Sequence, residues 1–187
     1  MKESFTTIEA IYYLLKKVGS ADKLKIVKLI YLVDKYHLFH YGRAVTDGDY
    51  FAMEYGPVNS TVKDILNFND FNMYKDEMDY ANRLIKKVRP HDFEAKSVNN
   101  FIFGHLSETD QEALDYVCEK FGKWGTNKLL KYTHKYPEWK KHEEKLKSGS
   151  RREDIKTVEL FSKIDEIFNV SDGHLEESKA MFLGDFV

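Results

Sequence analysis

The chain has 187 residues, of which 42% are hydrophobic and 14% aromatic, and this composition favours one globular domain over a disordered segment. Its 29 Lys and Arg residues face 31 Asp and Glu residues, for a net charge of -2. We therefore expect no direct nucleic-acid binding, because nucleic-acid-binding proteins usually carry a basic surplus. The single cysteine, Cys118, excludes an intramolecular disulfide and a zinc site built from several cysteines.

The first part of the chain has the hydrophobic periodicity of helices. Thr6 and Glu9 have the spacing of a capping box and predict a helix through about Lys17. A second helix is expected over about residues 21–41. Its apolar residues occupy more than one stripe, so we expect this helix to be buried on most sides at the centre of the core. Gly42 follows it, at the position expected for a left-handed residue.

A short β element is predicted next. A turn at Thr46–Asp49 leads into Tyr50–Tyr55, whose alternation is typical of a strand. Pro57 is well placed for the first turn of a further helix through about Phe68. Residues 69–100 lack a clear period, and there we expect short helices, an irregular strand and loops.

Helical signals return in the second half of the chain. Ser107–Asp110 resembles a capping motif, Thr126 begins a further helix, and Pro137 opens another. Residues 147–152 read as a flexible polar linker. The spacing of apolar residues in Ile155–Phe168 predicts an amphipathic helix.

These patterns predict a mainly α-helical fold, a compact multi-helix domain with a small β-hairpin or short sheet. We expect this domain to span residues 1–147, and residues 148–187 to form a C-terminal helical extension that packs on it. The N-terminus has no apolar signal segment, and no run reaches about 18 apolar residues. The sequence therefore predicts a cytoplasmic protein without membrane contact.

Motifs for cofactors and metals are missing from the sequence. The glycine-rich phosphate loops and the nucleophile elbow are absent. His37 and His40 have a spacing that suits two metal ligands, but no further Cys or His pattern completes the set. The prediction is therefore no metal and no cofactor.

His134 and Trp139 admit two interpretations. In the structural one, His134 caps a helix end and Trp139 packs in the core; in the other, the two form a catalytic or ligand-binding corner. An enzyme of unknown reaction would use His134 with Asp34 or Asp49 as acid and base. A carboxylate among tyrosines usually accepts their hydroxyl protons, so we favour structural roles for Asp34 and Asp49 and predict no catalytic residue.

Tyrosines crowd into the region between residues 31 and 55. Tyrosine is enriched in protein interfaces, but these side chains would also suit a core between the second helix and the strand. Both alternatives stay open. We predict a partner-binding role for the following residues: Tyr50, Tyr55, Asp49, His134 and Trp139.

Two blocks of the sequence resemble the signature of the Panacea antitoxin domain family, also called SocA-like. In the first block the matching residues are Lys28, Leu29, Tyr31, Asp34, Leu38, Gly42, Val45, Thr46, Tyr50, Ala52, Gly56, Pro57 and Val58. The second block is similar over Leu106–Asp110 and Leu130–Trp139, where Thr133, His134, Pro137 and Trp139 stand in register.

The resemblance implies a mainly helical domain with a small β element, found in bacterial and prophage toxin–antitoxin modules. Such a protein neutralises a cognate toxin, its partner, by direct protein contact and is not an enzyme. The alternative that the family offers is a proteolytic adaptor, which delivers its toxin to an AAA+ protease as a second partner.

Overall fold

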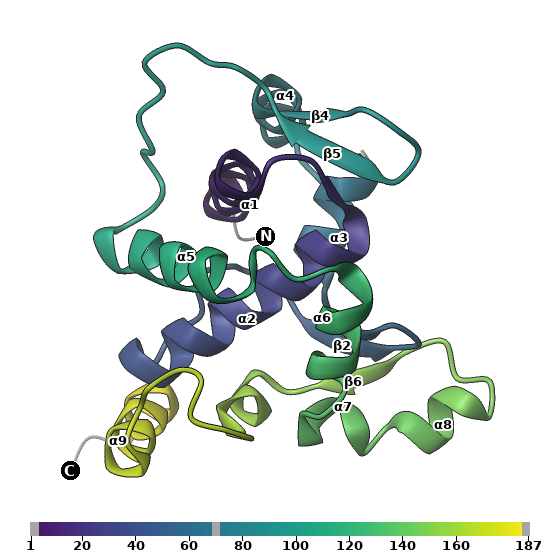
Figure 1. Cartoon of the computed structure of the whole chain (residues 1–187), viewed down its shortest axis with the longest axis vertical. Helices are drawn as coiled ribbons and strands as arrows, with labels where there is room; N and C mark the ends of the chain where they lie inside the picture. The colour runs from purple at the N-terminus through teal and green to yellow at the C-terminus, as the bar shows by residue number, and fades with distance from the viewer. Residues whose placement is uncertain (1–3, 69–71, 185–187) are drawn as a thin grey trace.

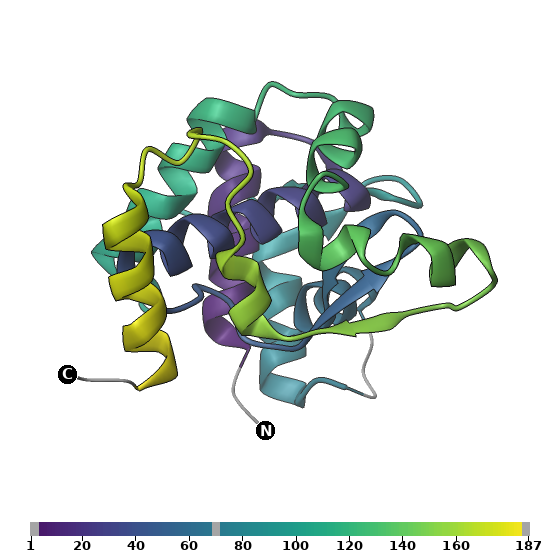
Figure 2. The same ribbon diagram turned by 90° about the horizontal axis from the view of Figure 1, so that it is seen from below.

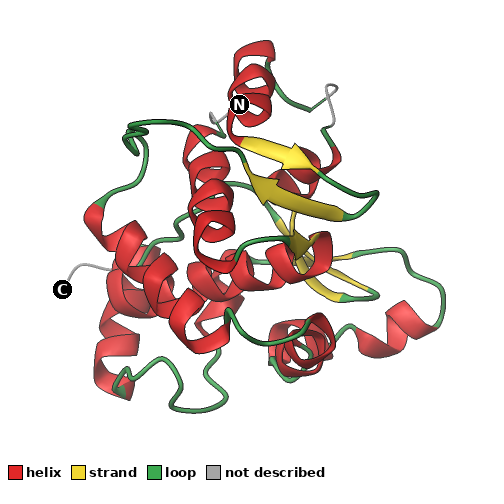
Figure 3. Cartoon of the chain, turned by 45° about the horizontal axis from the view of Figure 1, so that its top comes forward, coloured by secondary structure: helices red, strands yellow, loops and turns green. Residues whose placement is uncertain are grey.

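The computed structural model describes residues 4–68 and 72–184. Within them the chain is mainly α-helical with two small three-stranded antiparallel sheets (Figures 1 and 3). The predicted mainly α-helical class is thus confirmed, but the described residues form two small sheets where the prediction had one small hairpin or sheet. In chain order the elements are α1 (Phe5–Val18), β1 (Ala21–Asp22), α2 (Lys23–Tyr41), β2 (Tyr50–Met53), β3 (Gly56–Asn59), α3 (Ser60–Asn67), α4 (Lys75–Leu84), β4 (Ile85–Lys87), β5 (Asp92–Ala95), α5 (Glu108–Phe121), α6 (Thr126–Thr133), α7 (Pro137–Lys140), α8 (Glu143–Lys147), β6 (Glu153–Ile155), the 3₁₀ helix η1 (Thr157–Phe161) and α9 (Asp172–Leu183).

Helix α2 is the central post of the core, as its apolar pattern predicted. Every residue from Ile26 to Phe39 is buried, and the helix packs against α5, α6, α9 and β3. Figure 2 shows α9, in yellow, beside the C-terminal part of α2. Asp22 caps the helix by accepting a hydrogen bond from the Lys25 N–H at 3.0 Å. Gly42 ends it with φ +66°, so the predicted left-handed residue is confirmed.

The predicted capping box of α1 is wrong. The helix begins at Phe5 without a side-chain cap. Glu9 is fully buried instead, and its carboxylate accepts hydrogen bonds from the Tyr80 hydroxyl at 2.6 Å and the His105 N–H at 2.9 Å. Since these donors come from distant parts of the chain, the local spacing of Thr6 and Glu9 could not predict them.

The predicted helix through about Phe68 is present as α3, but its predicted start at Pro57 is wrong, because Gly56–Asn59 forms β3. Strands β2 and β3 are the two arms of a tight hairpin in which Phe51 pairs with Val58. Strand β3 lies at the edge of the sheet, where proline is tolerated. Helix α3 begins only at Ser60, capped by the Asn59 side chain, which accepts from the Val62 N–H at 3.1 Å.

The third correction concerns Ile155–Phe168, which does not form an amphipathic helix. Ile155 ends strand β6 and pairs with Tyr50 of β2, and η1 follows. Ile155 reaches the core from β6, Leu160 and Phe161 reach it from η1, and Phe168 reaches it from the irregular segment that follows. Pairing with β2 satisfies the backbone of β6. The predicted capping motif of α5 is confirmed: the Ser107 N–H donates to Asp110 at 2.8 Å and the Asp110 N–H donates to Ser107 at 3.2 Å.

The region that lacked a sequence period was predicted to hold short helices, an irregular strand and loops, and its described part contains α4, β4 and β5. Residues 69–71 lie outside the described part. Strand β5 pairs with β1 and β4 to form the second sheet. The division between residues 147 and 148 stays a prediction. Of the helices described, none is both long and apolar enough to cross a membrane.

Candidate functional site

Asp34, in the middle of α2, holds the loop between α2 and β2 from inside the core. Its carboxylate accepts hydrogen bonds from the Val45 N–H at 2.9 Å and the Thr46 N–H at 2.8 Å. The Tyr50 hydroxyl donates to the other carboxylate oxygen at 2.5 Å, as does the Thr46 hydroxyl. Asn59 completes the set by donating to the Thr46 hydroxyl oxygen at 3.2 Å. We call these five residues the Asp34 cluster.

Burial dominates the electrostatics of this cluster. Asp34 is 0% exposed, and burial raises the pKa of its carboxyl to about 6 although the hydrogen bonds from Thr46 and Tyr50 oppose the shift. Burial also raises the pKa of Tyr50 well above its ordinary value. The prediction that Asp34 accepts a tyrosine hydroxyl is confirmed. The carboxylate serves as an acceptor for donors of its own chain.

The turn of the hairpin is clamped between α2 and the α6–α7 corner. Lys28 is fully buried and donates from Nζ to the Pro57 carbonyl at 2.8 Å. Gly56 has φ +101°, and a methyl group added there would lie 2.8 Å from Lys28 Nζ and 3.1 Å from His134 Cδ2. The His134 ring stacks on Trp139, with centroids 3.7 Å apart and an interplanar angle of 11°. We call Lys28, Gly56, Pro57, His134 and Trp139 the clamp. Residues from both sequence blocks of the resemblance therefore meet in it.

Burial lowers the pKa of both titratable groups of the clamp. Burial lowers the pKa of Lys28 to about 7. Burial also lowers the pKa of His134, and the nearby charge of Lys28 adds to that effect. Both shifts reflect the cost of burying a cation.

A buried ion pair links α2 to α7. Lys35 Nζ lies 2.7 Å from the Glu138 carboxylate and donates to the Leu160 carbonyl at 2.6 Å. The Tyr31 hydroxyl donates to the same Glu138 oxygen at 2.5 Å. Burial lowers the pKa of Lys35 to about 8, against the attraction of Glu138. Sequence reasoning missed this pair, because nothing local relates α2 to residue 138.

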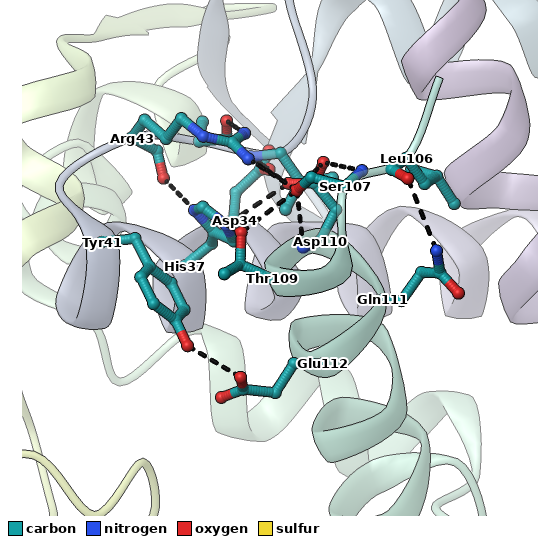
Figure 4. A network of polar contacts seen from close by, with 12 residues as sticks. Asp34, His37, Tyr41, Arg43, Leu106, Ser107, Thr109, Asp110, Gln111 and Glu112 are labelled. Atoms are coloured by element: carbon teal, nitrogen blue, oxygen red, sulfur yellow. Dashed lines mark hydrogen bonds and ion pairs between the residues drawn. The ribbon is translucent and has the colours of Figure 1, made fainter. Parts of the chain in front are cut away.

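A further network joins the C-terminus of α2 to the N-terminus of α5 (Figure 4). His37 Nδ1 lies 2.8 Å from the Arg43 carbonyl, which can only accept, so Nδ1 carries the proton. Neutral Nε2 then accepts from the Thr109 hydroxyl at 3.0 Å. Burial lowers the pKa of His37. The Arg43 guanidinium pairs with Asp110 at 2.7 Å and contacts Ser107 at 3.0 Å, so the network fixes two helix ends.

The catalytic alternative receives no supporting geometry. In the described chain no hydrogen bond links His134 to Asp34 or Asp49: His134 stacks on a tryptophan, and Asp34 is occupied within its cluster. His40 Nε2 lies 2.9 Å from the Phe168 carbonyl, so the two histidines of α2 have different partners. Among the described residues, no group of three or more His, Cys, Asp or Glu side chains could hold a metal ion.

The predicted partner-binding residues fall into two groups. Tyr50 and Trp139 are 2% and 4% exposed, and Trp139 donates from its indole N–H to the Met53 carbonyl at 2.8 Å. His134 is half-buried. Tyr55 is 52% exposed at the turn of the hairpin, and Asp49 is exposed beside the start of α3. A surface role stays a prediction, with Tyr55 the most accessible of the aromatic residues in this set.

Tyr55 borders a groove of about 660 Å³ between the start of α2, the hairpin turn and the loop after α8. In Figures 1 and 2, α8 and this loop project from the rest of the chain. The groove carries three basic side chains: Lys23, Lys63 and Arg151. Its apolar surface comes from Leu24, Val27, Met53, Tyr55, Val58 and Leu146. We call it the Tyr55 groove.

Sequence reasoning found only Tyr55 among the residues of this groove. The lysines at the start of α2 and the basic end of the 147–152 linker were visible signals. However, they lie more than a hundred residues apart in the chain, and only the fold brings them together.

Comparison with known proteins returns one family and no individual relative. No curated protein and no solved structure matches the chain significantly. The family model described as "Antitoxin SocA-like, Panacea domain" matches residues 26–140, which include both resembling blocks. The match covers more than half of the chain, and the chain therefore belongs to the SocA-like antitoxin family with a Panacea domain.

Proposed function

We propose that this chain is the antitoxin of a bacterial or prophage toxin–antitoxin module, and that it neutralises its toxin by direct protein–protein binding. The observation that carries the proposal is the antitoxin family match over residues 26–140. A stable complex of this kind requires an interface of at least about 1,000 Å².

The internal geometry favours binding over catalysis. The titratable residues that the sequence offered as an acid–base pair are engaged in separate contacts, Asp34 with its own loop and His134 with Trp139. A general acid or base has to reach a bound substrate, and Asp34 is fully buried. The surface is then the part of the molecule that meets the partner.

Co-expression with the neighbouring gene tests the proposal. We expect the neighbour's product to arrest growth when produced alone, and this chain to restore growth and to co-purify with that product in a fixed ratio. A neighbour that is harmless alone, or growth rescue without a complex, contradicts neutralisation by binding.

The lifetime of the toxin separates masking from proteolytic delivery. After protein synthesis is stopped, masking leaves the toxin's half-life unchanged when this chain is present. Delivery to an AAA+ protease shortens the half-life, and the effect disappears in a strain that lacks the protease. We expect the unchanged half-life.

A further inference from the structure

The Tyr55 groove combines an apolar surface with an excess of positive charge. Three cations, Lys23, Lys63 and Arg151, line it against one carboxylate, Glu54, on a chain whose net charge is -2. Three cations placed close together repel one another. A basic surface on a chain with net negative charge therefore needs a physical explanation.

Lys23 experiences like charges although its ammonium group donates a hydrogen bond to the Asn67 side chain. Burial lowers the pKa of its ammonium group, and the charges of Lys63 and Lys87 lower it further, against a weaker attraction from Asp64. A carboxylate placed in the groove would relieve this repulsion.

The apolar surface is equally open to a partner. Tyr55 is half-exposed at the hairpin turn, and Leu24, Met53 and Leu146 are only partly covered. A second hollow of about 240 Å³ shares Met53, Val58 and Lys63 with the groove, and its Asp64 and Arg152 add one charge of each sign. The two together suit an extended chain segment, with one large side chain in the larger hollow, better than a compact small molecule.

We propose that the Tyr55 groove binds an acidic segment of a protein partner, with a large apolar side chain of that segment packed against Tyr55 and its carboxylates placed beside Lys23, Lys63 and Arg151. The proposal rests on the proposed function, whose toxin would supply the segment. Nucleic acid is the poorer occupant, because the groove surface is largely apolar and the chain as a whole is acidic.

A synthetic peptide tests the chemistry without the toxin. The probe is a fluorescent peptide in which a Trp is flanked by glutamates, and its binding is followed by fluorescence anisotropy. Two control peptides replace the glutamates by glutamines or the Trp by Ala. We expect each control to bind about tenfold more weakly than the probe.

Protein variants locate the binding. Lys63→Glu, Arg151→Glu and Tyr55→Ala are each expected to weaken probe binding about tenfold. Lys131→Glu, a matched charge reversal at an exposed lysine of α6 outside the groove, should leave it unchanged. Circular dichroism confirms that each variant is folded.

Three results overturn the proposal: no binding of the probe, equal binding of the glutamine peptide, or equal loss in Lys131→Glu and Lys63→Glu. Binding of duplex DNA that Lys63→Glu abolishes, without binding of the probe, assigns the groove to nucleic acid instead.

The growth assay keeps the two proposals separate. If the wild-type chain and Lys63→Glu both rescue growth equally, the groove proposal fails and the antitoxin role stands. If the wild-type chain binds the peptide through the groove but does not rescue growth, the antitoxin role fails while the groove chemistry stands.

Discussion

The hairpin β2–β3 has two faces with different surroundings. Tyr50 points inward to the Asp34 cluster, whereas Met53, three residues later, points outward to the Tyr55 groove, as the alternation of a strand requires. On the inner face each polar group has a partner within the chain. On the outer face apolar groups, Lys63 and Arg151 line the Tyr55 groove, together with Lys23, which also donates to the Asn67 side chain. One short element thus both fixes the fold and offers a surface.

The difference between the two faces predicts that substitutions on the inner face lower the free energy of unfolding. Asp34→Ala removes the acceptor of four hydrogen bonds and leaves their buried donors unpaired, so we expect a loss of about 3–5 kcal/mol in the free energy of unfolding. Urea denaturation measures it. Asp34→Asn keeps one oxygen for the backbone donors and should lose less. An Asp34→Ala variant within about 1 kcal/mol of wild type contradicts the role of the cluster.

Gly56, the glycine of the clamp, allows two matched alanine variants to be compared. Gly56→Ala and Gly149→Ala both place a side chain at positive φ, +101° and +106°, but only the methyl group at residue 56 meets neighbouring atoms. We expect both variants to lose about 1–3 kcal/mol of unfolding free energy through the strained backbone conformation. Gly56→Ala should lose about 1–3 kcal/mol more, because Lys28 cannot move away from the added methyl group. Equal losses in thermal or urea unfolding would show that the clamp tolerates the extra methyl group.

The buried lysine of the clamp makes stability depend on pH. The folded chain releases the Lys28 proton near pH 7, whereas the unfolded chain holds it to about its ordinary pKa of 10.5. The unfolded state binds more protons between these values, so the free energy of unfolding rises with pH from 7 upward. We expect a rise on the order of 1–3 kcal/mol from pH 7 to pH 9, measured by urea denaturation.

Lys28→Met isolates this contribution. It should flatten the rise without abolishing it, because Lys35, with its pKa lowered to about 8, acts in the same direction. A slope as steep as that of the wild type would assign the pH dependence to other groups.

The smallest effects come from removing single hydroxyl groups. Tyr50→Phe deletes the donor to Asp34 and should cost about 1–2 kcal/mol of unfolding free energy. Tyr55→Phe, on the exposed side of the same hairpin, should stay within about 0.5 kcal/mol of the wild type. Similar losses in the two variants would remove the distinction between the faces.

Local signals predicted the parts of the fold that depend on neighbouring residues. The reciprocal cap of Ser107 and Asp110 and the left-handed Gly42 lie within one helical turn of the residues they serve, and both are confirmed. The spacing of Thr6 and Glu9 is equally local, yet Glu9 bonds to Tyr80 and His105 instead. Glu9 thus accepts hydrogen bonds from distant segments in place of the local N–H that a capping box would supply.

Much of the candidate site depends on such distant contacts. Lys28, Gly56 and His134 could be named from the sequence as members of two resembling blocks, but their contact at the clamp is a product of the fold. The pairing of Lys35 with Glu138 joins α2 to α7 across the core. Periodicity and capping carry no information on contacts of this range.

The sequence by itself determined the family, the helical class and the central position of α2, because these follow from residue types, spacing and period. Only the tertiary structure decided that Ile155 joins β2 as a strand and that the α8 loop closes one side of the Tyr55 groove. The physical reason is that strand pairing and grooves are made by segments far apart in the chain, whose encounter depends on the packing of the whole core.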